Sequence, residues 1–165
     1  MEIAVVTKGD KEIMRKLEAL TGTQAKAVLR KGLREGAKVF LQQIRSNVVS
    51  MFSGAKISKR TGKHNTRIGM FRKIMRKALT VRAGKKRRRG FISFRVIFNT
   101  DKYPELFDDT SEGKRYFIPT LLEYGHGGAK PIPFMRSAFD AKKNQALRVT
   151  MTKMRDEMEN LAKRK

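Results

Sequence analysis

The sequence contains no cysteine, no tryptophan, only four prolines and no long hydrophobic run. Without cysteine the chain has neither a disulfide framework nor a thiolate metal site, which is typical of proteins that fold in a reducing compartment. The first residues lack the basic start and apolar core of a secretion signal, and no uncharged stretch approaches the roughly 18 residues of a membrane span. These absences predict a chain that is neither secreted by that route nor inserted in a membrane.

Acidic residues are absent from residues 36–100, although this stretch contains 18 Lys and Arg residues. The whole chain has 39 basic and 15 acidic residues and a formal net charge of +24, so most of the excess lies in its middle. Such a field attracts polyanions or acidic protein surfaces, and the attraction weakens as the salt concentration rises. The charge therefore indicates a negatively charged partner.

The length and the 39% hydrophobic content predict a single domain over residues 1–165. Asp10 is placed to cap a first helix, and Thr23 to cap a longer helix that runs to about Phe52. Apolar residues recur at helical spacing along the longer helix and predict its core face: Leu29, Leu33, Ala37, Phe40, Ile44 and Val48. A C-terminal helix should begin at Pro133 and carry a seam at four-three spacing, formed by Leu147, Met151, Met154, Met158 and Leu161. This seam predicts pairing with the long helix or with a neighbouring subunit.

The middle of the chain predicts a flexible loop and a β-hairpin. Residues 53–70 are polar and basic and show no sustained apolar period, which favours a flexible loop. Segments 78–82 and 91–98 have β composition and flank a hairpin tip at residues 84–90. Residues 99–114 are expected to form an acid-containing connection. The chain thus predicts an α+β fold, in which a long N-terminal-half helix and a C-terminal helix pack on a small, mainly antiparallel sheet with the basic hairpin.

The hairpin tip contains five consecutive cations, Lys85, Lys86, Arg87, Arg88 and Arg89. It has two interpretations: a contact for DNA phosphates or an acidic partner, and a solvated turn that keeps the protein soluble. The surrounding acid-free region favours the contact. Because the run contains no aromatic side chains for base stacking, any nucleic-acid binding should be independent of sequence.

Residues 116–139 combine a short apolar helix, a glycine-containing loop and two prolines that precede the C-terminal helix. Gly125 permits a positive φ, and Pro133 fits the first turn of the helix in which Phe134 follows. We interpret Glu123 as a structural carboxylate that accepts backbone donors of the loop or pairs with Arg136, and so holds the turn together. A catalytic role is less favoured, since no second carboxylate or base is fixed beside it in the sequence.

The Leu-Glu-Tyr-Gly sequence at 122–125, followed by Pro-Phe-Met-Arg at 133–136 and by Ala138, resembles the neck and tail-completion proteins of long-tailed bacteriophages. The order of a long amphipathic helix, a Thr-Gly signal at 61–62 and a β-hairpin is similar too. The resemblance implies a non-enzymatic structural protein of the virion that works as a homo-oligomeric ring at the head-tail junction. The resemblance also implies synthesis in the host bacterial cytoplasm. The implied partners are a connector or head-closure ring and a tail terminator or tail tube, with double-stranded DNA as a further contact.

Three alternatives compete with this interpretation. Charge alone supports a sequence-nonspecific nucleic-acid-binding protein, and tail terminators and head-closure proteins are small proteins of adjacent layers. A metal-free ribonuclease would use His64, Arg67 and Tyr124 around a phosphodiester, but nothing in the sequence brings them together. The two histidines, His64 and His126, lack metal-ligand spacing, so we predict no metal, no cofactor and no catalytic residues.

Overall fold

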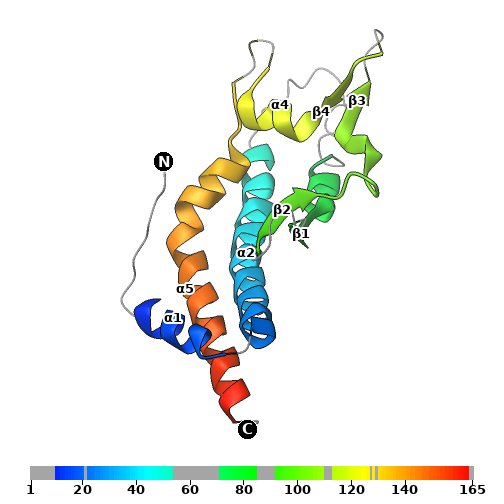
Figure 1. The fold of residues 1–165 in the computed structure, drawn as a ribbon. Helices are drawn as coiled ribbons and strands as arrows, with labels where there is room; N and C mark the ends of the chain where they lie inside the picture. The colour runs from blue at the N-terminus through cyan, green and yellow to red at the C-terminus, as the bar shows by residue number, and fades with distance from the viewer. Residues whose placement is uncertain are drawn as a thin grey trace. The chain divides into compact units, whose positions relative to one another are not determined.

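The computed structural model describes residues 10–20, 22–53, 71–84, 92–109, 113–126, 128 and 130–163. These residues confirm the predicted α+β fold, because the chain has a long helix in its first half, a C-terminal helix and two small antiparallel sheets (Figure 1). Residues 54–70 of the predicted loop and 85–90 of the predicted hairpin tip lie outside the described residues.

The chain divides into two compact units. Unit 1 comprises Met1–Val39, Ala83–Arg95 and Asn144–Lys165, and unit 2 comprises Phe40–Arg82 and Val96–Lys143. Each unit has its own hydrophobic cluster. A single domain over residues 1–165 therefore stays a prediction.

Unit 1 is built from three helical segments. They are α1 (Asp10–Glu18), the first part of α2 (Gly22–Ser53) and the last part of α5 (Phe134–Ala162). Ile13 and Leu17 lie one turn apart on α1 and are buried against Val28 of α2 and two methionines of α5, Met154 and Met158. Figure 1 shows α1 next to the end of α5, where this cluster forms. The amphipathic spacing of each helix thus becomes a shared apolar core.

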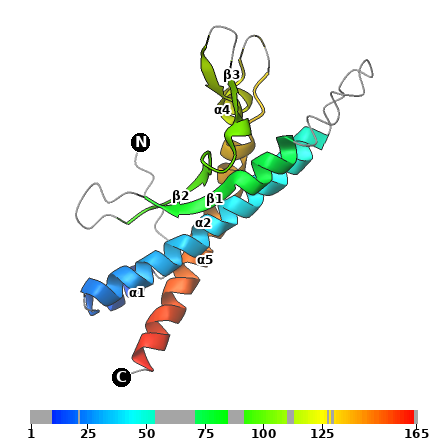
Figure 2. The same ribbon diagram turned by 90° about the vertical axis from the view of Figure 1, so that its right-hand side faces the viewer.

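Unit 2 places the rest of α2 beside a helix over residues 71–78 (Figure 2). Its core is a cluster of buried side chains from four parts of the chain: Ile44, Val48, Met75, Ala78, Leu79, Leu106, Phe134 and Ala138. The strand β1 (Leu79–Ala83) follows the 71–78 helix directly and pairs with β2 (Phe94–Phe98) in a two-stranded sheet. Two backbone hydrogen bonds of 2.8 Å flank this ladder, one from Asn99 N to Ala78 O in unit 2 and one from Gly84 N to Ser93 O, two residues that belong to unit 1.

The second sheet arises where the sequence predicts only a connection. After the short 3-10 helix η1 (Pro104–Leu106), β3 (Phe107–Asp109) pairs antiparallel with β4 (Arg115–Phe117), and Phe107 lies opposite Phe117. The two rings lie 5.2 Å apart between centroids, and Leu106 is fully buried. Strands of three residues are too short to show a two-residue hydrophobic period, so the sequence pattern does not reveal them. α4 (Ile118–Tyr124) follows β4 without a break.

Candidate functional site

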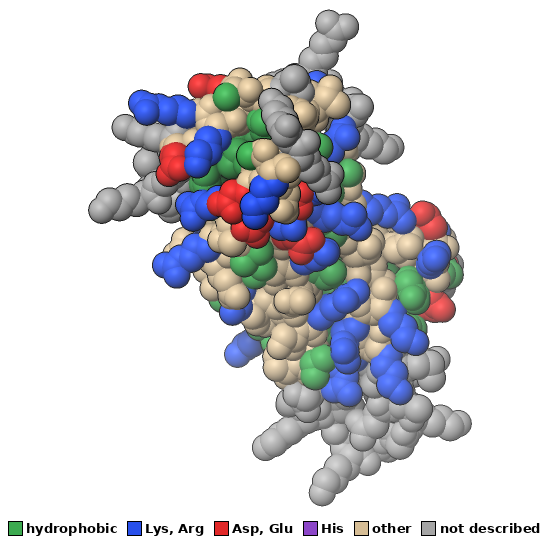
Figure 3. All heavy atoms as spheres, turned by 90° about the horizontal axis from the view of Figure 1, so that it is seen from below, with side chains coloured by type: hydrophobic (Ala, Val, Ile, Leu, Met, Phe, Trp, Pro, Cys, Tyr) green, Lys and Arg blue, Asp and Glu red, His purple; other side chains and the backbone are tan. Residues whose placement is uncertain are grey.

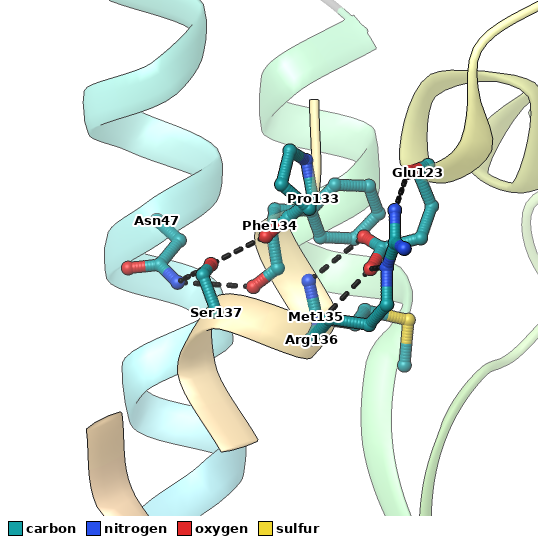
Figure 4. A network of polar contacts seen from close by, with 7 residues as sticks. All are labelled: Asn47, Glu123, Pro133, Phe134, Met135, Arg136 and Ser137. Carbon is teal, nitrogen blue, oxygen red and sulfur yellow. Dashed lines mark hydrogen bonds and ion pairs between the residues drawn. The ribbon is translucent and has the colours of Figure 1, made fainter. Parts of the chain in front are cut away.

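The polar network where α4 meets the start of α5 is centred on Glu123 (Figure 4). Its carboxylate accepts hydrogen bonds from the backbone N–H groups of Met135 and Arg136, at 2.9 Å each, and from Arg136 Nε at 3.1 Å. Arg136 Nη2 also donates to the Glu123 carbonyl oxygen at 2.7 Å. Glu123 is only 4% exposed. The hydrogen bonds and the ion pair with Arg136 replace the water that the carboxylate loses on burial.

This network completes the N-terminus of α5. The first N–H groups of a helix have no partner within it, and Pro133, which precedes α5, has no side-chain acceptor to supply one. Glu123 replaces that missing cap from α4, and its negative charge also suits the positive end of the helix dipole. Phe134 N donates to Ile132 O, and Ser137 N donates to Pro133 O, which satisfies the other donors of the turn.

Asn47 ties the same turn to α2. Its Nδ2 donates to Phe134 O at 3.0 Å and to Ser137 Oγ at 3.1 Å, while Ser137 Oγ donates to Pro133 O (Figure 4). Gln43 Nε2 in turn donates to Asn47 Oδ1 at 2.8 Å. The buried amide therefore links α2 to α5, as Glu123 links α4 to α5, and we call the whole arrangement the Glu123 clamp.

The loop inside the clamp depends on glycine. Gly125 ends α4 with φ 80° and ψ 157°, a conformation that is essentially restricted to glycine. Ile132 N donates to Leu122 O at 2.7 Å and closes the loop. Pro133 lies directly before α5, which begins at Phe134, and the Phe134 side chain is fully buried. The five residues that the sequence singles out in this motif thus lie in one connected turn.

Two aromatic side chains stand at the surface beside the clamp. Tyr124 is 64% exposed, and the Arg136 guanidinium lies 4.8 Å from its ring centroid. Phe139 is 55% exposed and stacks on Phe40, with 5.3 Å between the centroids. Aromatic and arginine side chains are enriched at the centres of protein interfaces. Tyr124, Arg136 and Phe139 are therefore candidates for contacts with a partner.

The geometry around Glu123 suits a structural role, which is to fix α4 against the start of α5, better than proton transfer. Every hydrogen bond to the Glu123 carboxylate comes from a backbone N–H at the start of α5 or from Arg136, so the carboxylate serves as the acceptor for this turn. Within the described ranges, no group of three His, Asp or Glu side chains comes together as a metal site. Two of the residues nominated for ribonuclease chemistry, His64 and Arg67, lie outside the described residues, and the third, Tyr124, packs on Arg136.

The predicted seam of α5 packs within the chain. Met154 and Met158 are buried in the unit 1 cluster, and Met151 and Leu161 pack against it; Leu147 is half-buried. Their partners in this cluster are Ile13 and Leu17 of α1 and Val28 of α2. Four of the five seam residues therefore have intramolecular partners, in keeping with the helix-pairing alternative.

Two glycines that the sequence analysis does not single out set the spacing between α2 and α5 in unit 1. A Cβ atom at Gly36 would overlap the Thr150 hydroxyl and lie 3.0 Å from the Ala146 carbonyl oxygen. One at Gly32 would overlap the Met154 side chain and lie 3.0 Å from the Thr150 carbonyl oxygen. Their separation of four residues, one helical turn, is the signal that sequence reasoning can use to find such a contact.

An ion-pair network bridges the same two helices. Glu157 of α5 accepts from Lys31 Nζ of α2 at 2.6 Å and from Lys153 Nζ at 2.9 Å. The hydrogen bonds from Lys31 and Lys153 hold the pKa of the Glu157 carboxyl below its ordinary value of 4.5. The same interaction raises the pKa of Lys153.

We expect this network to make the stability of unit 1 depend on pH. Because the pKa of Glu157 is lowered on folding, its stabilisation is fully present above about pH 4.5 and is lost as the pH falls through the lower folded value. At pH 7, Glu157→Gln should lower the melting temperature by about 2 °C, since both lysines are partly exposed. Thermal unfolding of both proteins from pH 7 to pH 3 checks this, and a difference that stays constant across that range would contradict it.

Basic side chains are spread widely over the surface. Figure 3 shows Lys and Arg over much of one face, with acidic side chains in small groups. The cations of the hairpin tip, Lys85, Lys86, Arg87, Arg88 and Arg89, lie outside the described residues. Among the described residues, exposed cations line α2 at Lys26, Arg30 and Arg34 and the 71–78 helix at Lys73, Arg76 and Lys77. None of the described helices has a segment long and apolar enough to span a bilayer.

Residues 11–125 match the family described as "Bacteriophage HK97-gp10, putative tail-component". The matched region begins in α1 and ends at Gly125, so it includes Glu123. No curated protein and no solved structure showed significant similarity to the chain.

Proposed function

Since the chain belongs to the HK97-gp10-like family of bacteriophage tail components, we propose that it is a neck or tail-completion protein, which joins the tail to the DNA-filled head as a ring of identical copies. The family match over residues 11–125 is the observation that carries this proposal. In this function the protein is structural and non-enzymatic, and it resides at the head-tail junction of the virion. Its partners are the connector or head-closure ring on one side and the tail terminator or tail tube on the other.

The Glu123 clamp supports an assembly function. A ring subunit must present two different surfaces in a fixed geometry, because head-to-tail contacts close only at one rotation angle. The clamp fixes the start of α5 by hydrogen bonds from α4 and α2, and it lies beside the exposed Tyr124 and Phe139. In unit 2 the surface residues therefore stand on a rigid support.

The test is electron microscopy of lysates from the encoding phage with an early stop codon in this gene. We expect DNA-filled heads and finished tails to accumulate separately, and a plasmid-borne wild-type gene should restore joined particles. Tails of irregular length would instead identify a tail terminator. Intact infectious particles without the protein would overturn the proposed function.

A second candidate function is sequence-nonspecific nucleic-acid binding, which the net charge of +24 favours. In either function, the predicted hairpin tip at Lys85–Arg89 would contact the phosphates of double-stranded DNA or an acidic protein surface. Tight binding of the monomer to random duplex DNA, together with no requirement for the gene in particle assembly, would favour this function over a junction component.

A further inference from the structure

One group of exposed charges in unit 2 is a rigid basic face. It consists of three side chains on the 71–78 helix: Lys73, Arg76 and Lys77. The opposite side of this helix is held by Met75 and Ala78, which are fully buried in the core. These cations therefore project from a well-anchored element, and we call them the basic face.

The second group is an acidic edge in the same unit. It consists of Asp101, Glu105 and Asp108, which are exposed around η1 and β3. This segment is anchored by the fully buried Leu106 and by the packing of Phe107 on Phe117. Residues 101–109 contain four acidic residues and one cation, directly after the acid-free stretch 36–100. The net charge along the sequence thus changes from positive to negative within one compact unit.

The two groups are not neutralised within the part of the chain that the structure describes. The ion pairs there join other residues, such as Arg115 with Asp109 at 3.5 Å, and none involves the basic face or the acidic edge. Within the described residues, the three cations and the three carboxylates thus have no ion-pair partner.

Copies of this chain must overcome strong mutual repulsion to stand side by side. Each carries a net charge of +24, and like charges brought together at an interface cost several kcal/mol. A local match of opposite charges offsets this repulsion and fixes which surfaces meet. A head-to-tail contact also needs two different surfaces on each copy, which the basic face and the acidic edge supply.

We propose that the basic face of one copy docks on the acidic edge of the next copy. This inference rests on the proposed ring and names the charges that specify its repeating contact. Duplex DNA would also fit the basic face, but it leaves the acidic edge of the same unit without a partner and repels it. A second copy of the chain, by contrast, provides a partner for both the basic face and the acidic edge.

Reciprocal charge reversal tests the contact. The variants K73E/R76E/K77E and D101K/E105K/D108K, and the chain that combines all six changes, are supplied in trans to the phage that lacks the gene. Each triple variant should lower the yield of infectious particles at least about 100-fold, because like charges then face each other. The combined variant should restore the yield to within about tenfold of wild type, since it recreates the match in reverse.

A matched control separates this specific pairing from net charge. The variant K26E/R30E/R34E combined with D101K/E105K/D108K has the same total charge as the full reversal, but it changes cations of α2 instead of the basic face. It should not restore infectivity. All variants should melt within a few degrees of wild type.

The outcomes distinguish this inference from the proposed function. Infectious triple variants, or a folded combined variant that fails to restore infectivity, would overturn the docking inference while the ring remains. If only the basic-face reversal abolishes both infectivity and binding of the purified protein to duplex DNA, DNA is the partner of that face. Infectious phage without the gene would overturn both proposals.

Discussion

Replacing Glu123 by alanine is expected to lower the free energy of unfolding of unit 2 by about 3 kcal/mol. The substitution removes the acceptor for two backbone N–H groups of α5 and leaves the Arg136 guanidinium without its carboxylate. Removing one member of a buried, hydrogen-bonded ion pair costs several kcal/mol, but the Arg136 side chain is 52% exposed and can be rehydrated. Denaturant unfolding followed by circular dichroism measures the loss.

Glu105→Ala provides the control, because this glutamate lies in the same unit and is exposed. Its unfolding free energy should stay within about 0.5 kcal/mol of wild type. Glu123→Gln keeps one oxygen acceptor but loses the charge, so it should fall between alanine and wild type. A Glu123→Ala protein as stable as the control would show that water or another side chain replaces the clamp.

Substituting leucine at Gly36 should destabilise unit 1 by about 3 kcal/mol. The intrinsic helix preference favours leucine over glycine by nearly 1 kcal/mol. Whether the substitution stabilises or destabilises unit 1 therefore depends on packing. At this position a side chain meets the Thr150 hydroxyl and the Ala146 carbonyl oxygen, and the backbone oxygen can move only if α5 moves. The steric penalty is therefore expected to exceed the gain in helix preference, and the same unfolding measurement detects it.

Gly22→Leu is the matched control within the same helix. A Cβ atom at Gly22 has no other heavy atom within 4 Å, so leucine should cost no more than about 0.5 kcal/mol there. Equal effects at the two glycines would mean that helix preference, and not the close approach of α2 and α5, controls the result.

The helices are the part of the fold that the sequence predicts best. The long helix is predicted from Thr23 to about Phe52 and extends from Gly22 to Ser53, and the C-terminal helix begins one residue after the predicted Pro133. The predicted face of the long helix is confirmed, since Ala37, Ile44 and Val48 are buried. A repeat sustained over many turns gives a strong signal because each turn contributes to the same stripe.

The second sheet and the glycine contact depend on tertiary structure. The pairing of β3 with β4 is stabilised by the packing of Phe107 on Phe117 and by the burial of Leu106. The sequence pattern of a three-residue strand is too short to reveal these contacts. Similarly, Gly36 looks like a weak helix residue until Ala146 and Thr150 are known to lie against it. Local preference and spacing can suggest that a helix makes a close contact, but they do not identify the helix or strand that it contacts.

At the clamp, the sequence predicts the central pair of side chains but not every participant. Glu123 and Arg136 are nominated as a pair, and the structure brings them within 3.1 Å. The predicted backbone donors to Glu123 come from the start of α5, at Met135 and Arg136, and not from the loop. The amide of Asn47 is missed, because a buried amide has no distinctive spacing. The resemblance to phage tail proteins, by contrast, is confirmed by the family match.

The packing of α2 against α5 has a consequence for the order of events during synthesis. Gly32 and Gly36 lie more than 100 residues ahead of their contacts at Ala146, Thr150 and Met154. At the usual speed of a ribosome, roughly 5 to 20 s pass between the appearance of α2 and that of its partner surface. During this interval α2 can pack against α1 and, once it has been made, against the 71–78 helix, but the surface of α2 that faces α5 has no partner from its own chain. The core of unit 1 can therefore form only after the last helix has emerged, because Met154 and Met158 of α5 complete it.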